Sequence, residues 1–310
     1  MVVLIHRLIA VAELVLAAAL WGFGFIATIW ALRVFAAGEL VFLRFALAAM
    51  LVIPWLFFAR GRTNLRREAK LSFLPALLLT MTLLLQTWGL RYTTATKSGF
   101  ITTLYVVLVP LLERTLAGRH PLSRGMWVCV LSSLVGTALI VNLTQVTTMN
   151  FGDVLTFLCA LFAAGQIFYL GVVSPHVQHP FVFNLTQAFW SLLICAPLVA
   201  HSGFWEKLAL APQWPLPVTL GVLSLAFGST VIAFFLQVRA QAYLSPTVSS
   251  LLFLLESPFA LIFSLLLLDE SLGPFEAAGA TIIFVSAMAA SLLEARRKRS
   301  VDFAPEVLNS

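Results

Sequence analysis

The chain has 310 residues, of which 61% are apolar and only 10% charged, and its mean hydropathy is +0.99. Soluble globular proteins average roughly 45–50% apolar and about 25% charged residues, so this composition excludes a soluble domain and a disordered chain alike. About 20 apolar residues cross a bilayer, and the apolar content suffices for roughly eight to ten crossings. The sequence therefore predicts an all-α, polytopic membrane protein.

Ten apolar segments follow one another along the chain with short connections between them. They are Ile9–Leu32, Leu40–Ala59, Leu71–Leu90, Ser98–Leu116, Gly125–Leu143, Val154–Val173, Phe181–Ala200, Leu216–Val238, Val248–Leu268 and Phe275–Leu293. The first is longer than the roughly 7–15-residue apolar region of a signal peptide, so we expect it to be retained as a helix. No connection is long enough for a separate soluble domain.

The net charge of +6 comes from Lys and Arg at the ends of these segments, which favours a membrane topology signal over nucleic-acid binding. With a cytoplasmic N-terminus, one face would carry Arg7, Arg60, Arg62, Arg66, Arg67, Lys70, Arg114, Arg119, Arg124, Arg239, Arg296, Arg297, Lys298 and Arg299. The other face would carry Arg33, Arg91, Lys97 and Lys207. The positive-inside bias thus predicts that both termini are cytoplasmic.

Enzymatic and cofactor motifs are missing from the sequence. It contains no GxxxxGK[ST], HExxH or GxSxG, and its five His residues lie at or outside the segment ends. Cys129, Cys159 and Cys195 all lie inside apolar segments, which is not the pattern of a zinc site or a disulfide framework. We expect no enzyme activity, no metal and no cofactor.

The two halves of the chain carry a weak internal repeat. Arg91 and Arg239, and likewise Pro110 and Pro258, are separated by the same 148 positions. Similar separations relate two further pairs, Pro54 with Pro197 and Glu13 with Asp153. Because each half has five segments, an odd number, the second half must run inverted relative to the first, as in many secondary transporters.

Several stretches resemble EamA-type members of the drug/metabolite transporter superfamily. They are LWGFGFIATIWAL (Leu20–Leu32), LRFALAA (Leu43–Ala49), LQTWGLRYTTATKSGFITTLYVVLVPLL (Leu85–Leu112) and the long run from Leu236 to Ala280. The resemblance covers roughly residues 9–293.

The resemblance implies ten transmembrane helices in two inverted five-helix repeats, with the first repeat at 1–147, the second at 148–299 and a short cytoplasmic tail at 300–310. It also implies a multi-pass inner-membrane carrier that exports a small metabolite, an amino acid or a related compound, by alternating access. The cavity would lie between the first, third, fourth, sixth, eighth and ninth segments. Export of amphipathic drugs, a non-transporting scaffold and a passive pore are the alternatives, and the oligomeric state is undetermined.

Glu256 lies near the middle of the ninth segment, two residues before Pro258. A carboxylate at mid-membrane costs about 2.5–3.5 kcal/mol, so it is usually paired, protonated or facing water. Loss of water favours its protonated form, which suits a proton carrier. We therefore predict that Glu256 couples transport to protons; the alternative is a hydrogen bond that locks two helices.

Two cations and two amides are candidates for the substrate cavity. Arg44 lies inside the second segment, where it could bind a substrate carboxylate, neutralise Glu256 or reach outward to the interface. Lys97 could help to form a positive vestibule or simply lie at the interface. Gln86 and Gln237 could line the pathway or hydrogen-bond between helices.

Aromatic, glycine and proline residues complete the candidates. Trp21 and Tyr105 could stack on a solute or serve as packing. Gly22 and Gly24 favour close helix approach or a hinge, and Pro110 and Pro258 interrupt their helices.

Overall fold

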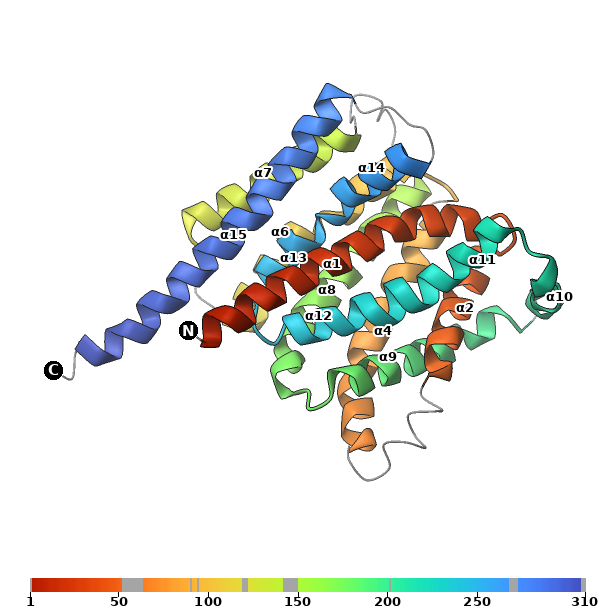
Figure 1. Ribbon diagram of the computed structural model, residues 1–310, viewed down its shortest axis with the longest axis horizontal. Coiled ribbons are helices and arrows are strands. Elements are labelled where there is room, and N and C mark those ends of the chain that lie inside the picture. Colours follow the sequence, from red (N-terminus) through yellow and green to blue (C-terminus); the bar gives the residue numbers. More distant parts are fainter. Residues whose placement is uncertain are drawn as a thin grey trace.

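A computed structural model gives the fold and describes residues 2–51, 64–89, 91–93, 95–118, 122–141, 150–200, 202–267 and 273–307 (Figure 1). Of residues 2–4, 95–97 and 297–307 only the backbone is described. All regular elements in these ranges are helices. The α-helices are α1 (Val2–Ala31), α2 (Ala37–Met50), α4 (Leu65–Gly89), α5 (Ala95–Thr102), α6 (Tyr105–Leu116), α7 (Arg124–Val141), α8 (Phe151–Val173), α9 (Pro180–Cys195), α10 (Phe204–Ala209), α11 (Leu216–Leu223), α12 (Phe234–Ala240), α13 (Pro246–Phe253), α14 (Glu256–Leu267) and α15 (Pro274–Val307). Short 3₁₀ turns occupy Ser174–His176, Ala196–Leu198 and Ala211–Gln213, and η5 (Ser224–Ala233) is a π-helix.

Nine helical stretches within the described residues are long and apolar enough to cross a membrane. They are Ile5–Ala31, Leu65–Gly89, Ser98–Leu116, Arg124–Val141, Phe151–His176, Pro180–Leu198, Leu216–Ala240, Pro246–Leu267 and Pro274–Arg296. Each coincides with a predicted segment, which confirms those nine predictions within a few residues. The other predicted segment, Leu40–Ala59, is described only through Leu51, where it forms α2.

Two of the spanning helices are broken, and a third changes its winding. The ninth predicted segment breaks at Leu254 and Leu255, between α13 and α14, because Pro258 cannot donate to the carbonyl of Leu254 and its ring crowds that carbonyl. The fourth predicted segment breaks between α5 and α6, upstream of Pro110. The eighth runs without a break from α11 through η5 into α12, but η5 adopts the wider π-helical turn.

Sequence features at the helix ends agree with these boundaries. Asn150 caps α8 by accepting a hydrogen bond from the backbone N–H of Asp153 (3.1 Å), and the Asp153 carboxylate accepts in return from the Asn150 N–H (2.9 Å). Ser245 caps α13 by accepting a hydrogen bond from the backbone N–H of Val248 (3.3 Å), with Pro246 at the first helical position.

Helices from the two halves of the chain pack mainly against each other. In Figure 1, α1 crosses the centre of the bundle and packs on η5, α12, α13 and α14, while α4 packs on α8 and α9. The second half mirrors the first: α8 packs on α4, α5 and α6 of the first half, just as α1 packs on α12, α13 and α14 of the second half. Contacts between α2 and α9 and between α7 and α15 join equivalent helices, and α6 of the fourth segment contacts α13 of the ninth segment, which is its equivalent. This pairing fits two related halves.

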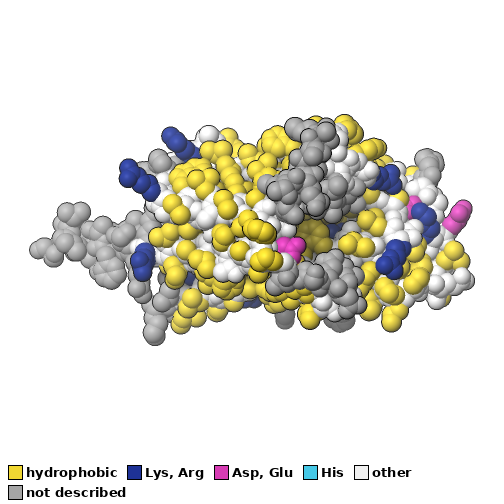
Figure 2. Space-filling view, turned by 90° about the horizontal axis from the view of Figure 1, so that it is seen from above, with side chains coloured by type: hydrophobic (Ala, Val, Ile, Leu, Met, Phe, Trp, Pro, Cys, Tyr) yellow, Lys and Arg dark blue, Asp and Glu magenta, His cyan; other side chains and the backbone are white. Residues whose placement is uncertain are grey.

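The outer surface has the character of a membrane protein. Figure 2 shows hydrophobic side chains over the middle of the elongated body and Lys and Arg side chains towards its two ends. Large apolar side chains such as Leu16, Val128, Leu131 and Phe284 are more than half exposed. Lipid is the solvent that accommodates such a belt.

Candidate functional site

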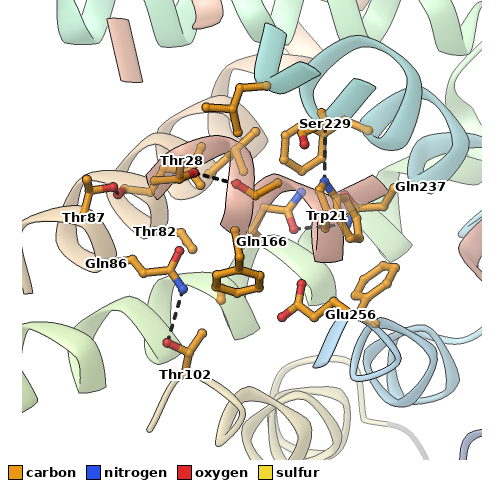
Figure 3. A pocket seen from close by; sticks show the side chains of 18 of the residues that line it. Trp21, Thr28, Thr82, Gln86, Thr87, Thr102, Gln166, Ser229, Gln237 and Glu256 are labelled. Atoms are coloured by element: carbon orange, nitrogen blue, oxygen red, sulfur yellow. Dashed lines mark hydrogen bonds between the residues drawn. The ribbon is translucent and has the colours of Figure 1, made fainter. Parts of the chain in front are cut away.

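A cavity of about 1040 Å³, the open space at its mouth included, lies inside the bundle. Its wall comes from α1, α2, α4, α5, α6, α8, η5, α12, α13 and α14, so it includes every helix that the resemblance assigned to the cavity and adds α2. Aromatic side chains and a limited set of polar groups face it (Figure 3).

The cavity brings together all the predicted substrate and proton residues whose side chains the structure describes. They are Trp21, Arg44, Gln86, Tyr105, Gln237 and Glu256. The side chain of Lys97 lies outside the described part of the chain. The roles of these residues in transport remain predictions.

Arg44 is the buried cation of this wall, with 8% of the residue exposed. Its Nε donates a 2.9 Å hydrogen bond to the hydroxyl of Thr230, and that hydroxyl donates to the carbonyl of Leu225 at 2.8 Å. Asn184 braces the same turn of η5 by donating to the carbonyls of Thr230 (3.2 Å) and Val231 (2.9 Å). Within the described ranges, Arg44 is therefore held through Nε, and it lines the cavity instead of reaching outward to the interface.

Glu256 is the acidic group of the wall. It begins α14, directly after the break that Pro258 causes, and its carboxyl group points into the cavity in Figure 3, facing Gln86 and Thr102 on the opposite side. Within the described residues, Glu256 makes no ion pair with Arg44. The two opposite charges thus share one cavity without neutralising each other directly.

The uncharged polar groups form two clusters. Gln86 donates to the hydroxyl of Thr102 across 3.4 Å, a long hydrogen bond between α4 and α5. Gln237 donates through Nε2 to Gln166 (3.2 Å) and to Gln241 (3.1 Å), which links α12 to α8.

Aromatic rings make up much of the remaining wall. The indole N–H of Trp21 donates to the carbonyl of Ser229 at 3.2 Å, and its ring centre lies 5.3 Å from that of Phe234 and 5.1 Å from that of Phe253. Tyr105 is 4% exposed. Trp21 is thus fixed by hydrogen bonding and by edge contacts with neighbouring rings.

The predicted glycine and proline positions lie at close contacts or within helices. A Cβ on Gly22 would come within 2.8 Å of the Glu256 carbonyl and the Ala260 backbone nitrogen, so Gly22 lets α1 approach the backbone of α14. A Cβ on Gly24 would meet the Ser229 hydroxyl at 2.9 Å. Pro110 lies inside α6 and is buried.

Polar contacts join the two halves at the end of the bundle where α1 begins. They are Arg7 with Glu294 (3.0 Å), Arg239 with Glu13, and the backbone N–H of Thr247 with Glu113 (3.2 Å). Glu13 precedes Trp21 by eight residues, or about 12 Å along α1, so these contacts lie between the cavity and that end.

At the other end of α1, Lys207 of α10 contacts both carboxylate oxygens of Glu39, at 2.7 and 3.0 Å. The backbone N–H of Ala36 also donates to Glu39, at 2.7 Å. Burial raises the pKa of this carboxyl, but the hydrogen bonds from Lys207 and Ala36 outweigh it, and the pKa falls below its ordinary value.

Sequence reasoning missed the hydroxyl groups of the wall and its π-helix. The hydroxyl residues are Thr28, Thr82, Thr87, Thr102 and Ser229. Thr28 follows Gly24 by four positions and Thr82 precedes Gln86 by four, so helical spacing could have placed both on the cavity face. No pattern in the sequence indicates that residues 224–233 wind as a π-helix.

Comparison with known proteins agrees with this architecture. Residues 8–142 and 150–292 each match the EamA-like transporter family. The chain belongs to that family. This EamA-like protein is also 30% identical over 288 residues to an uncharacterised transporter of Archaeoglobus fulgidus. The matched region covers 93% of this chain and 87% of the relative. It is therefore a multi-pass membrane transporter, and an inner-membrane location is consistent with that.

A solved crystal structure has a similar fold, with a TM-score of 0.67 over 93% of this chain and 98% of the other. The two sequences are 20% identical, so this likeness concerns the fold alone.

Proposed function

We propose that this EamA-like transporter is a proton-coupled secondary carrier that exports a small metabolite with a carboxylate, an amino acid or a related compound, by alternating access. Arg44 binds the carboxylate, Glu256 carries the proton, and Gln86 and Gln237 contribute polar recognition. Trp21 and Tyr105 contact the apolar part of the solute.

The observation that carries the proposal is the pair of opposite charges on one buried cavity wall. Charged groups inside a membrane protein are costly and mark solute or proton paths more often than structural sites. Arg44 is anchored through Nε, and its planar fork can bind a carboxylate through the remaining nitrogens. Because Glu256 is not tied up by Arg44, it remains able to exchange a proton with the cavity.

For the topology, we infer ten transmembrane helices in two inverted repeats with cytoplasmic termini. The nine described spans and α2 supply the helices, and the distribution of Lys and Arg between the two faces supports the orientation. The end of the bundle with the Arg7–Glu294 contact would then be cytoplasmic. Buried contacts at that end favour a carrier that closes on one side over a passive pore.

The test is a transport assay in proteoliposomes that contain a trapped pH dye. Wild type, Glu256→Gln and Glu206→Gln would each be challenged with pooled amino acids and related metabolites. Glu206 is a suitable control because its carboxylate lies in α10, away from the cavity. We expect a substrate-dependent pH change in wild type and in the control, and none in Glu256→Gln.

A pH signal that persists in Glu256→Gln would contradict the assignment of the proton to this residue. Radiolabelled counterflow without any pH signal in wild type would indicate exchange or uniport. Uptake confined to amphipathic cations would support the drug-exporter alternative, for which the aromatic wall around Trp21 is the favouring observation.

A further inference from the structure

Three glutamine side chains form a continuous hydrogen-bond chain at the wall of the cavity. Gln241 donates through Nε2 to the backbone carbonyl of Ile167 at 2.9 Å. Gln237 then donates through its own Nε2 to Gln241 (3.1 Å) and to Gln166 (3.2 Å). All three residues are at most 4% exposed, and two of them, Gln166 and Gln237, line the cavity.

The direction of this chain is fixed at its far end. A backbone carbonyl can only accept, so the amide of Gln241 must turn its NH₂ group towards Ile167 and its oxygen towards Gln237. Gln237 must then turn its NH₂ group towards Gln241, and the same NH₂ group donates to the oxygen of Gln166. The orientation of each amide follows from that of its neighbour.

Among the described residues, this direction leaves one acceptor and one donor without a hydrogen-bond partner. They are Oε1 of Gln237 and Nε2 of Gln166, and both atoms are shielded from water in this conformation. A buried polar atom without a hydrogen bond is unfavourable, so a group that satisfies both atoms would be bound preferentially.

The chemistry of the two atoms selects the group. A carboxylate only accepts hydrogen bonds, so it cannot satisfy the Gln237 oxygen, which also only accepts. An ammonium only donates, so it cannot satisfy the Gln166 NH₂ group, which also only donates. A carboxamide or a hydroxyl can donate to the Gln237 oxygen and accept from the Gln166 NH₂ group. Figure 3 shows Gln166 and Gln237 beside Trp21, apart from the carboxyl group of Glu256.

We propose that Gln166 and Gln237 form a subsite for an uncharged donor–acceptor group of the substrate, a carboxamide or a hydroxyl. The inference rests on the proposed function, in which Arg44 binds the carboxylate and Glu256 carries the proton. It adds that the preferred substrate carries a neutral polar group besides its charged ends. Gln241 acts as a positioning residue, since it orients the pair without lining the cavity.

An unpaired amide alone would not single out this pair. Gln187 is 1% exposed, and neither of its polar atoms has a hydrogen-bond partner within the part of the chain that the structure describes, yet it does not line the cavity. It therefore provides a matched control, because it has the same residue type and the same burial away from the proposed subsite.

The experiment compares amino acids of similar chain length in proteoliposomes. Counterflow of radiolabelled glutamine, norleucine, glutamate and ornithine would be measured with wild type, Gln166→Leu, Gln237→Met and Gln187→Leu. We expect wild type to transport glutamine at least about tenfold more efficiently than norleucine, since norleucine leaves both atoms unsatisfied. The ratio should fall towards one in Gln166→Leu and Gln237→Met and persist in Gln187→Leu.

Norleucine flux in the same vesicles reports how much folded carrier each variant contributes, so the ratio is independent of expression. Equal transport of glutamine and norleucine by wild type would overturn the subsite, while the proposed function would stand. A glutamine preference that survives both cavity variants would also overturn it. Failure of wild type to transport any of the four compounds would overturn this inference, whereas the proposed function would be overturned only if the pooled amino acids and related metabolites gave no flux either.

Discussion

Substituting Gly22 by alanine should separate two helices at the cavity. An added Cβ would lie 2.8 Å from the Ala260 backbone nitrogen, from the Glu256 carbonyl oxygen and from the Phe259 Cβ. Ordinary contacts of carbon begin near 3.4 Å, so α1 and α14 must move apart by about half an ångström, and backbone atoms cannot rotate away. Overpacking of this kind costs about 1–3 kcal/mol, of which the better helix propensity of alanine recovers up to about 1 kcal/mol.

We therefore expect Gly22→Ala to lower the stability by about 1–2 kcal/mol, which corresponds to a fall of roughly 2–8 °C in Tm in detergent. Transport should fall as well, because the displaced turn carries Glu256. Gly24→Ala is the matched control, since its Cβ would come too close only to the rotatable hydroxyl of Ser229, at 2.9 Å, and would meet Leu225 Cδ2 at an ordinary 3.8 Å. That variant should stay within about 1 kcal/mol of wild type.

Thermal unfolding of the purified proteins and counterflow in proteoliposomes measure both effects. Wild-type Tm and flux in Gly22→Ala would refute the reasoning that the α1–α14 contact is too tight for a methyl group. An equal loss in Gly24→Ala would show that any added methyl in this part of α1 is harmful, whatever it meets.

Two further predictions concern Thr230, which binds Arg44, and Glu39, which binds Lys207. Thr230→Val removes the hydroxyl that accepts from Arg44 and keeps the shape of the side chain. We therefore expect KM for carboxylate substrates, measured by the concentration dependence of counterflow, to rise about tenfold with little change in kcat. An unchanged KM would contradict a positioning role for Thr230. Glu39→Gln should lower the stability by about 1–2 kcal/mol near pH 7, because it weakens the contact with Lys207. Since the folded protein lowers the pKa of Glu39, its charged form stabilises above the unfolded pKa of about 4.3, and that contribution is lost as the pH falls through the folded value. The difference in Tm between Glu39→Gln and wild type should therefore vanish in acid. A difference that does not depend on pH would argue against a stabilising role for the charged form of Glu39.

The apolar segments were predictable because each crossing must bury its own backbone hydrogen bonds in about 20 apolar residues. That requirement acts locally, so nine described helices coincide with predicted segments. The break before Pro258 was also readable, since proline disturbs the helix at a fixed distance along the chain. Glu256 and Arg44 stood out because charges are rare in apolar segments.

The hydroxyl residues of the cavity wall were not predictable in this way. Threonine and serine are common in membrane helices, where their hydroxyls often bond to the carbonyl one turn earlier, as Thr28 does with Gly24 at 2.7 Å. Whether such a residue faces lipid, another helix or a cavity depends on how its helix is rotated. Thr230 became significant only when folding brought it to Arg44, 186 positions away in the chain.

By itself, the sequence determined the membrane class, nearly all the crossings and the rare charged residues within them, because each of these follows from the local cost of placing polar groups in lipid. The tertiary structure decided which polar groups meet. It paired Arg44 with Thr230 of η5 instead of with Glu256. It also joined Gln166 to Gln237 and, within the described residues, left one donor and one acceptor of that pair without a hydrogen bond. Such pairings depend on the packing of distant helices, and hydropathy contains no information about them.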